Sequence, residues 1–171
     1  MASPSNHQHL QAALKSTALQ QERVDPAAAS MFAALQAALT AEGLPTDDVH
    51  EPGRQFFAYL NDRQALTGFG GFEIHGEHAL VRSIVVLPGH RGQGLVWSIV
   101  PMVLEQAALA GAKHAWLLTE GASQVFNRLG FEAADRENVP PAIGQTRQFR
   151  QLCGETATLM HKPLKAAALS A

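Results

Sequence analysis

The sequence has little cysteine and no long apolar run. Its single cysteine, Cys153, excludes an internal disulfide and a zinc site built from several thiolates. No stretch approaches the roughly 18 consecutive apolar residues that a membrane-spanning helix needs. The first residues also lack the charged and apolar segments of a signal peptide. We therefore expect a cytoplasmic protein that does not enter a membrane.

Clustered positive charge is also missing. The chain has 13 Lys and Arg against 15 Asp and Glu, a net charge of -2, and no basic patch in the sequence. This balance argues against nucleic acid or an anionic membrane as a partner. The eight histidines show no metal-ligand spacing, so no metal is expected. With 171 residues and 46% apolar composition, the chain suits one globular domain. We place this domain at 18–171 and read the polar, Ala-rich stretch 1–17 as an N-terminal extension, flexible or with a short helix.

Glycines are concentrated where an apolar segment gives way to a helical pattern. The segment Val85–Leu95 contains Pro88 and three glycines before the helix. Glycines let the backbone approach a ligand closely, and a helix start offers unpaired N–H groups to an anion. Arg91 adds a guanidinium suited to phosphate. The spacing matches neither the P-loop nor the dinucleotide fingerprint, and an ordinary glycine-rich turn is the alternative.

Apolar periodicity and turn residues predict an α/β (α+β) domain with a mixed sheet. Strands are expected near 18–24, 56–60, 66–74, 79–87, 114–119 and 156–161. Helices are expected near 26–43, 92–110, 122–129 and 140–152. Pro101 should kink or split the second of these helices, because it lacks an N–H group.

Two motifs in order carry a family resemblance. The pattern R-G-x-G-x at Arg91–Leu95, after V-x-P, resembles the pyrophosphate-binding loop of the GNAT superfamily of N-acetyltransferases. A helix closing on Leu129-Gly130-Phe131 resembles the second hallmark of that superfamily. The resemblance covers about Ala18 to Leu164 and implies a mostly antiparallel mixed sheet, flanked by helices, that binds acetyl-CoA.

Further segments are similar to one subgroup, the acetyltransferases encoded in bacterial arsenic-resistance operons. They are Gly68–Glu73, Leu117–Thr119, Pro141–Ile143, Thr146–Phe149, Leu152-Cys153 and Ala157–Met160. The chain has Gly154 where the subgroup usually has proline.

The resemblance implies a set of site residues. The pantetheine arm of the cosubstrate would pair with Ile84, Val85 and Val86, and its pyrophosphate would lie on the loop. The expected loop and helix contacts are His90, Arg91, Gly92, Gln93, Gly94, Leu95, Val96 and Phe126. Ser83 and Thr119 would lie near the thioester, and Arg147 could clamp a substrate carboxylate, phosphonate or arsinic group.

The chain departs from the family at both proton-transfer positions. Phe126 stands where a tyrosine commonly protonates the leaving thiolate, and Leu80 where a glutamate often serves as base. Glu73 on the neighbouring strand is therefore the first candidate base, although a solvated carboxylate is as good an interpretation, and Glu120 is the reserve. Val96 replaces a usual glycine or alanine and could narrow the phosphate site.

The sequence thus predicts an acetyl-CoA-dependent N-acetyltransferase; it leaves the oligomeric state open, with a homodimer as one option. Its acceptor would be a small amine, either an amino acid or an arsenical or phosphinic analogue, and its role could be arsenic resistance. A non-catalytic acyl-CoA-binding or sensor protein with a degenerate site is the main alternative. A third reading is an accessory protein that binds arsenicals through Cys153, although a buried structural thiol is the simpler role for that residue.

Overall fold

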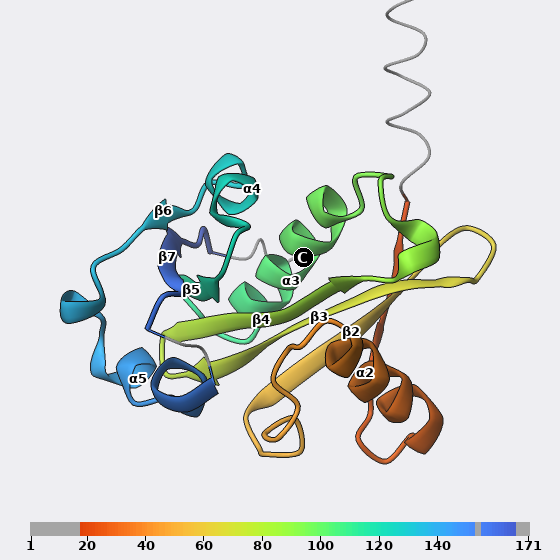
Figure 1. Ribbon diagram of the computed structural model, residues 1–171, viewed down its shortest axis with the longest axis horizontal. Coiled ribbons are helices and arrows are strands. Elements are labelled where there is room, and N and C mark those ends of the chain that lie inside the picture. Colours follow the sequence, from red (N-terminus) through yellow and green to blue (C-terminus); the bar gives the residue numbers. More distant parts are fainter. Residues whose placement is uncertain (1–17, 153–154, 167–171) are drawn as a thin grey trace, which may run out of the picture.

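The computed structural model describes residues 18–152 and 155–166. Its strands form one seven-stranded sheet in the order β1-β2-β3-β4-β5-β7-β6 (Figure 1). The strands are β1 Gln20–Arg23, β2 Arg54–Leu60, β3 Leu66–His75, β4 His78–Val86, β5 His114–Thr119, β6 Glu132–Ala133 and β7 Thr158–Pro163. The paired strands are antiparallel except β4 and β5, which are parallel. The predicted mixed, mostly antiparallel sheet is confirmed.

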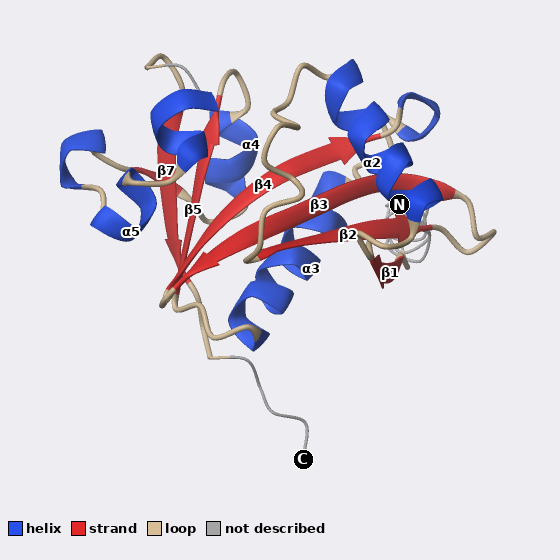
Figure 2. Cartoon of the chain, turned by 90° about the horizontal axis from the view of Figure 1, so that it is seen from below, coloured by secondary structure: helices blue, strands red, loops and turns tan. Residues whose placement is uncertain are grey.

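Helices cover both faces of this sheet. They are α2 Ala29–Ala41, α3 Val96–Leu109, α4 Ser123–Arg128 and α5 Pro141–Gly144, and a π-helical turn, Gln148–Leu152, follows α5. In Figure 2, α2 and α5 lie before the sheet and α3 lies behind it. Alternation along the strands produces this division: Phe57 and Val81 join the cluster under α3, whereas Phe56 packs with α2 and Leu80 with α5.

The strands β4 and β5 pair only at their first residues. His78, Ala79 and Leu80 face His114, Ala115 and Trp116, and no further pair joins these two strands in the described chain. Beyond that point the strands diverge, as Figure 1 shows. The remaining length of β4 therefore presents an unpaired edge toward β5.

A bulge lies in β4 just beyond the point of divergence. Phe69 of β3 faces Val85 and Gly71 faces Arg82, so two residues of β4, Ser83 and Ile84, oppose one residue of β3. Ser83 has φ of 60°, an uncommon conformation for a residue with a side chain. The bulge thus redirects the strand where the sheet opens.

Three helix predictions need correction. The first helix begins at Ala29, because Asp25 instead accepts the Ala27 N–H in a preceding turn. The helix α3 is not split at Pro101 but continues through it. Pro101 lies on the exposed side of α3, and the opposite side of the helix packs on the sheet. The predicted helix 140–152 is interrupted after Gly144, since the Thr146 hydroxyl bonds the Ile143 carbonyl and accepts the Phe149 N–H.

Some expectations fall on other parts of the chain. The N-terminal extension 1–17 and Cys153 lie outside the described residues. The two-residue strand β6 was not predicted, because it is too short for a recognisable alternation. No helix in the described ranges has the length and apolar character needed to cross a membrane.

Candidate active site

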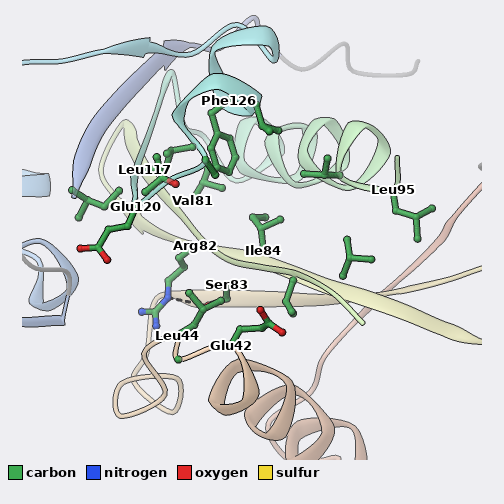
Figure 3. A pocket seen from close by; sticks show the side chains of 18 of the residues that line it. Glu42, Leu44, Val81, Arg82, Ser83, Ile84, Leu95, Leu117, Glu120 and Phe126 are labelled. Atoms are coloured by element: carbon green, nitrogen blue, oxygen red, sulfur yellow. Dashed lines mark hydrogen bonds between the residues drawn. The ribbon is translucent and has the colours of Figure 1, made fainter. Parts of the chain in front are cut away.

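A cavity of about 790 Å³ occupies the opening between β4 and β5. The loop after β4 lines one end and the carboxyl end of β5 lines the other; in Figure 3, Leu95 and Glu120 mark these two ends. Phe126 reaches from α4 toward Val81 and Ile84, and Glu42 and Leu44 line the side of α2. The cavity is therefore elongated and joins an anion-binding loop to a polar end.

The loop at the first end has backbone conformations that require glycine. Gly92 and Gly94 have φ of 78° and 71°, in the left-handed region. The helix α3 follows at Val96 without a side-chain cap. The N–H groups of Trp97 and Ser98 donate to the Gly94 and Leu95 carbonyls, whereas the Val96 N–H has no backbone partner in the described chain and is available to a ligand. Together with the positive end of the helix dipole, this loop suits a pyrophosphate.

Arg91 of this loop is held by two groups of the protein. Its Nε donates to the Val86 carbonyl at 3.0 Å, and its Nη2 forms an ion pair with Glu42 at the end of α2. Both side chains are largely exposed. The pair is therefore open to exchange with an incoming anion, which would compete with Glu42 for the guanidinium.

Most of the expected site residues lie together around the cavity. Those that line it are Ser83, Ile84, Val85, Val86, His90, Arg91, Gly92, Gly94, Leu95, Val96, Thr119, Glu120 and Phe126. Gln93, Glu73 and Arg147 are not among the lining residues. The loop, the bulged strand and the end of β5 thus line one cavity.

Glu73 is placed away from this cavity, in a buried ionic cluster. It is 1% exposed and accepts a hydrogen bond from Arg82 Nη1 at 3.1 Å. Its other oxygen lies 2.8 Å from His75 Nε2. Because the carboxylate is buried against these partners, its position does not favour the proton-accepting role expected from the sequence.

Arg82 lines the cavity, but its hydrogen-bonding capacity is used within the protein. Its two Nη atoms bond Asp48 at 2.5 and 2.7 Å, and Nη1 also bonds Glu73. Its remaining donors reach the Pro45 carbonyl and the Ser83 hydroxyl, the latter bond drawn in Figure 3. A guanidinium has five N–H donors, so none is left for a ligand.

The cluster also shifts the charge states of its members. Burial alone would raise the pKa of Asp48, but hydrogen bonds and charge from Arg82 and Arg54 outweigh it and hold that pKa below its usual value. Burial would lower the pKa of Arg82, and Asp48 and Glu73 reverse this and raise it. Both shifts favour the ionised forms of Asp48 and Arg82.

The positions that depart from the family have clear surroundings. Phe126 lines the cavity and packs edge-to-face on Phe131, with 5.9 Å between the two ring centroids. Leu80 is fully buried in the cluster under α5. Val96 is the first residue of α3 and lines the cavity, which remains hollow beside it.

Tyr59, the only tyrosine in the sequence, is fully buried. Its hydroxyl donates to Gln21, and burial raises its pKa. Tyr59 is not a lining residue of the cavity.

Glu120 and Arg147 differ in their position relative to the cavity: Glu120 lines it and Arg147 does not. Glu120 is exposed at the end of β5 and accepts a hydrogen bond from the Thr156 hydroxyl at 3.0 Å. Arg147 donates to Glu51 at 2.9 Å. Of these two residues, only Glu120 is therefore positioned to meet a substrate in the cavity.

Several lining residues were missed by the sequence analysis. They are Glu42, Leu44, Pro45, Arg82 and Gln148. A charged residue inside the apolar strand 79–87 was a signal for Arg82, and Gln148 lies in the segment Thr146–Phe149 that carries the subgroup resemblance, although no role was assigned to it. Among the described residues, no group of three or more His, Cys, Asp or Glu is arranged to hold a metal ion.

Comparisons with solved structures show a shared fold. One is an acyl-CoA N-acyltransferase, assigned without proof of activity, from Klebsiella pneumoniae (19% identity, TM-score 0.66, covering 87% of this chain and 99% of that one). Another is N-acetylglutamate synthase from Neisseria gonorrhoeae with coenzyme A and N-acetyl-glutamate (14% identity, TM-score 0.68, covering 86% of this chain and 35% of that one). A third is a mutant spermidine N-acetyltransferase from Vibrio cholerae (11% identity, TM-score 0.65, covering 85% of this chain and 93% of that one).

Sequence comparison defines the family. No curated protein matches the chain. The model of the acetyltransferase (GNAT) family matches residues 19–131, more than half of the chain. This match includes the glycine loop, the diverging strands β4 and β5, and α4 with the Leu129–Phe131 turn that follows it. The chain therefore belongs to the acetyltransferase (GNAT) family.

Proposed function

We propose that the protein transfers the acetyl group of acetyl-CoA to the amine of a small molecule. The observation that carries this proposal is the elongated cavity between β4 and β5, with the glycine loop at one end and Glu120 at the other. A nucleotide thioester and an amine can meet in such a cavity, because one end suits phosphate and the other end is open and polar.

The chain offers groups for each part of acetyl-CoA. The N–H groups around Gly92 and Gly94, with Arg91, would hold the pyrophosphate. The edge of β4 at 84–86 would pair with the pantetheine arm as an added strand. Acetyl-CoA would supply a thioester that is activated toward attack by an amine.

The transfer forms a bond from the amine nitrogen to the acetyl carbon and breaks the carbon–sulfur bond. The nitrogen loses one proton, and the thiolate leaves and takes a proton from solvent. Glu120 is the proposed acceptor of the amine proton, directly or through water, because Glu73 is buried among cations. A thiolate is a good leaving group, so Phe126 in the tyrosine position slows this step without preventing it.

Two acceptor classes follow from different observations. The sequence likeness to the arsenic-resistance subgroup favours an amino acid or an arsenical or phosphinic analogue, and with it a role in arsenic resistance. These acceptors carry an acid group that needs a cation. The polar end of the cavity instead favours amines in general.

Calorimetric titration with acetyl-CoA tests the cosubstrate site. Gly94→Trp should abolish micromolar binding. The backbone at Gly94 is left-handed, which strains any residue with a side chain, and an added Cβ would contact Trp97. The matched control is Gly89→Trp in the same loop, where an added Cβ meets nothing within 4 Å. Absence of binding to the wild type would overturn the proposal.

Turnover separates the enzyme from a binding protein. The wild type should release free thiol from acetyl-CoA when a panel of small amines is supplied. Glu120→Gln should lower kcat while leaving acetyl-CoA binding unchanged. Tight acetyl-CoA binding without thiol release for any amine would support the acyl-CoA sensor alternative.

A further inference from the structure

Gln148 presents a buried polar group with no partner in the wall of the cavity. The residue is 4% exposed, lines the cavity and begins the π-helical turn after α5. Its Oε1 is buried and has no hydrogen-bond partner. Leaving a buried acceptor unpaired is costly, so such a group in a binding cavity is best explained by a ligand that donates to it.

The position of Gln148 is at the end of the cavity where the acceptor amine would enter. Its neighbour Phe149 and Leu118 of β5 both pack against the buried cluster under α5. Thr119 and Glu120, which follow Leu118, also line the cavity. We call the end formed by Thr119, Glu120 and Gln148 the acceptor end. The terminal torsion of glutamine is soft, so Oε1 can turn toward an entering donor at little cost.

The charges around the acceptor end do not suit an acid group. Glu120 contributes a carboxylate, and the nearby cation, Arg82, has all its donors bound to the protein. Two carboxylates, Asp48 and Glu73, contact Arg82, so its charge is already compensated. Arg91 lies in the glycine loop, at the phosphate end. A substrate carboxylate at the acceptor end would therefore lie next to Glu120, and among the described residues that line this end no cation has a free donor for it.

We infer that Gln148 Oε1 accepts an N–H of the acceptor amine, and that the acceptor is a primary amine with no acid group beside its nitrogen. This inference rests on the proposed acetyltransferase function and specifies its substrate class. A primary amine has more than one N–H, so one can bond Gln148 while another faces Glu120. Gln148 then orients the nitrogen, and Glu120 favours a neutral or cationic substrate over an acidic one.

Matched acceptors test the substrate class. The rate of thiol release is compared for phenethylamine, phenylalaninamide and phenylalanine, and for histamine and histidine. We expect kcat/KM at least tenfold higher for each amine than for its amino acid, with the amide close to the amine because it lacks the negative charge. Equal rates for the members of each pair, or a preference for the acids, would overturn the inference while leaving the acetyltransferase function intact.

Substitution tests the role of Gln148. Gln148→Met keeps the length of the side chain and removes the acceptor, and it should raise KM for the amine about tenfold with KM for acetyl-CoA unchanged. The matched control is Gln145→Met, which changes an exposed glutamine outside the cavity lining. A purely structural residue would not separate the two KM values, and that result would contradict the role.

Stability provides a second readout of the same substitution. Because Gln148→Met removes an unpaired buried acceptor, the melting temperature of the free protein should stay the same or rise. A lower melting temperature with both KM values raised equally would mean that Gln148 only supports the fold. Failure to bind acetyl-CoA at all would instead contradict the proposed function itself.

Discussion

Arg82 and Asp48 form a two-pronged ion pair between a strand and a distant loop. Arg82 Nη1 lies 2.5 Å from Asp48 Oδ2, and Nη2 lies 2.7 Å from Oδ1. Both side chains are at most 1% exposed. Arg82 immediately precedes the bulged residue Ser83, so the pair fixes the loop that follows α2 against the strand that opens the cavity.

Asp48→Ala should destabilise the protein by about 3 kcal/mol, because it leaves Arg82 buried with its principal partner removed. Urea denaturation measures this change. Asp47→Ala, at an exposed neighbouring carboxylate, is the matched control and should change stability little. A loss below about 0.5 kcal/mol for Asp48→Ala would mean that Arg82 is satisfied without Asp48.

Asp48 should also make the free energy of unfolding depend on pH in the acid range. Its folded pKa lies below the usual 3.8, so the pair stabilises the protein fully above that pH. The contribution is lost as pH falls from 3.8 through the lower folded pKa. Stability measured across this range should therefore fall less steeply in Asp48→Asn than in the wild type. Parallel curves would contradict the assignment.

Glu42→Gln should tighten acetyl-CoA binding by a few-fold, because Glu42 now competes with the pyrophosphate for Arg91. Arg91→Gln should weaken binding about tenfold. Glu105→Gln, an exposed residue of α3, makes the same change in net charge away from the cavity and serves as control. Calorimetry at two salt concentrations measures each effect, and equal gains for Glu42→Gln and Glu105→Gln would exclude specific competition.

Gly68→Ala should destabilise the protein by about 2 kcal/mol or more through a clash in the sheet. An added Cβ would lie 2.4 Å from the Val85 carbonyl oxygen, which belongs to the backbone of β4 and cannot move freely. Gly89→Ala, where the same atom meets nothing, should be nearly neutral. Thermal unfolding of the two variants makes the comparison, and similar melting temperatures would show that β3 and β4 can separate at that point.

Acidification below pH 6.5 should destabilise the folded chain through two histidines. Burial, followed by the charge of His114, lowers the pKa of both His78 and His161 below 6.5. Between the lowered folded pKa and 6.5 the unfolded chain binds more protons, so stability falls as pH falls through this window. Trp116 Nε1 donates to His78 Nδ1 at 3.0 Å, a bond that protonation of that nitrogen removes.

The difference in unfolding free energy between pH 8 and pH 5.5 measures this effect. His78→Gln keeps an acceptor for Trp116 without titrating, so the difference should shrink. An unchanged difference would assign the loss of stability to other groups.

The family and the sheet were accessible from local patterns. Glycines at 92 and 94 follow an apolar strand and precede a helix, and this order indicates an anion-binding turn because only short-range geometry is needed. The apolar segments 66–74 and 79–87, separated by the turn residues His75-Gly76-Glu77, likewise predicted the hairpin of β3 and β4, whose partners are close in sequence. These features depend on neighbours along the chain.

The candidate base could not be ranked in the same way. Glu73 and Glu120 are both carboxylates near strand ends, and the sequence contains no sign that Asp48 and Arg82 enclose the first of them. Likewise, the hydrogen bonds of Thr146 redirect the backbone after α5 and place Gln148 in the cavity wall. The sequence contained no sign of this change of direction, because the stretch 140–152 was predicted as one helix.

By itself, the sequence determined the strand and helix types, the glycine loop and the membership of an acetyltransferase family, because these follow from residue propensity and short motifs. Only the tertiary structure decided which charges are free at the cavity. Arg82 and Asp48 are far apart in the chain, yet they meet across the loop and β4 and neutralise each other. Burial and pairing are properties of that long-range packing, which places Glu120 and Gln148 in the lining of the cavity and Glu73 and Arg147 outside it.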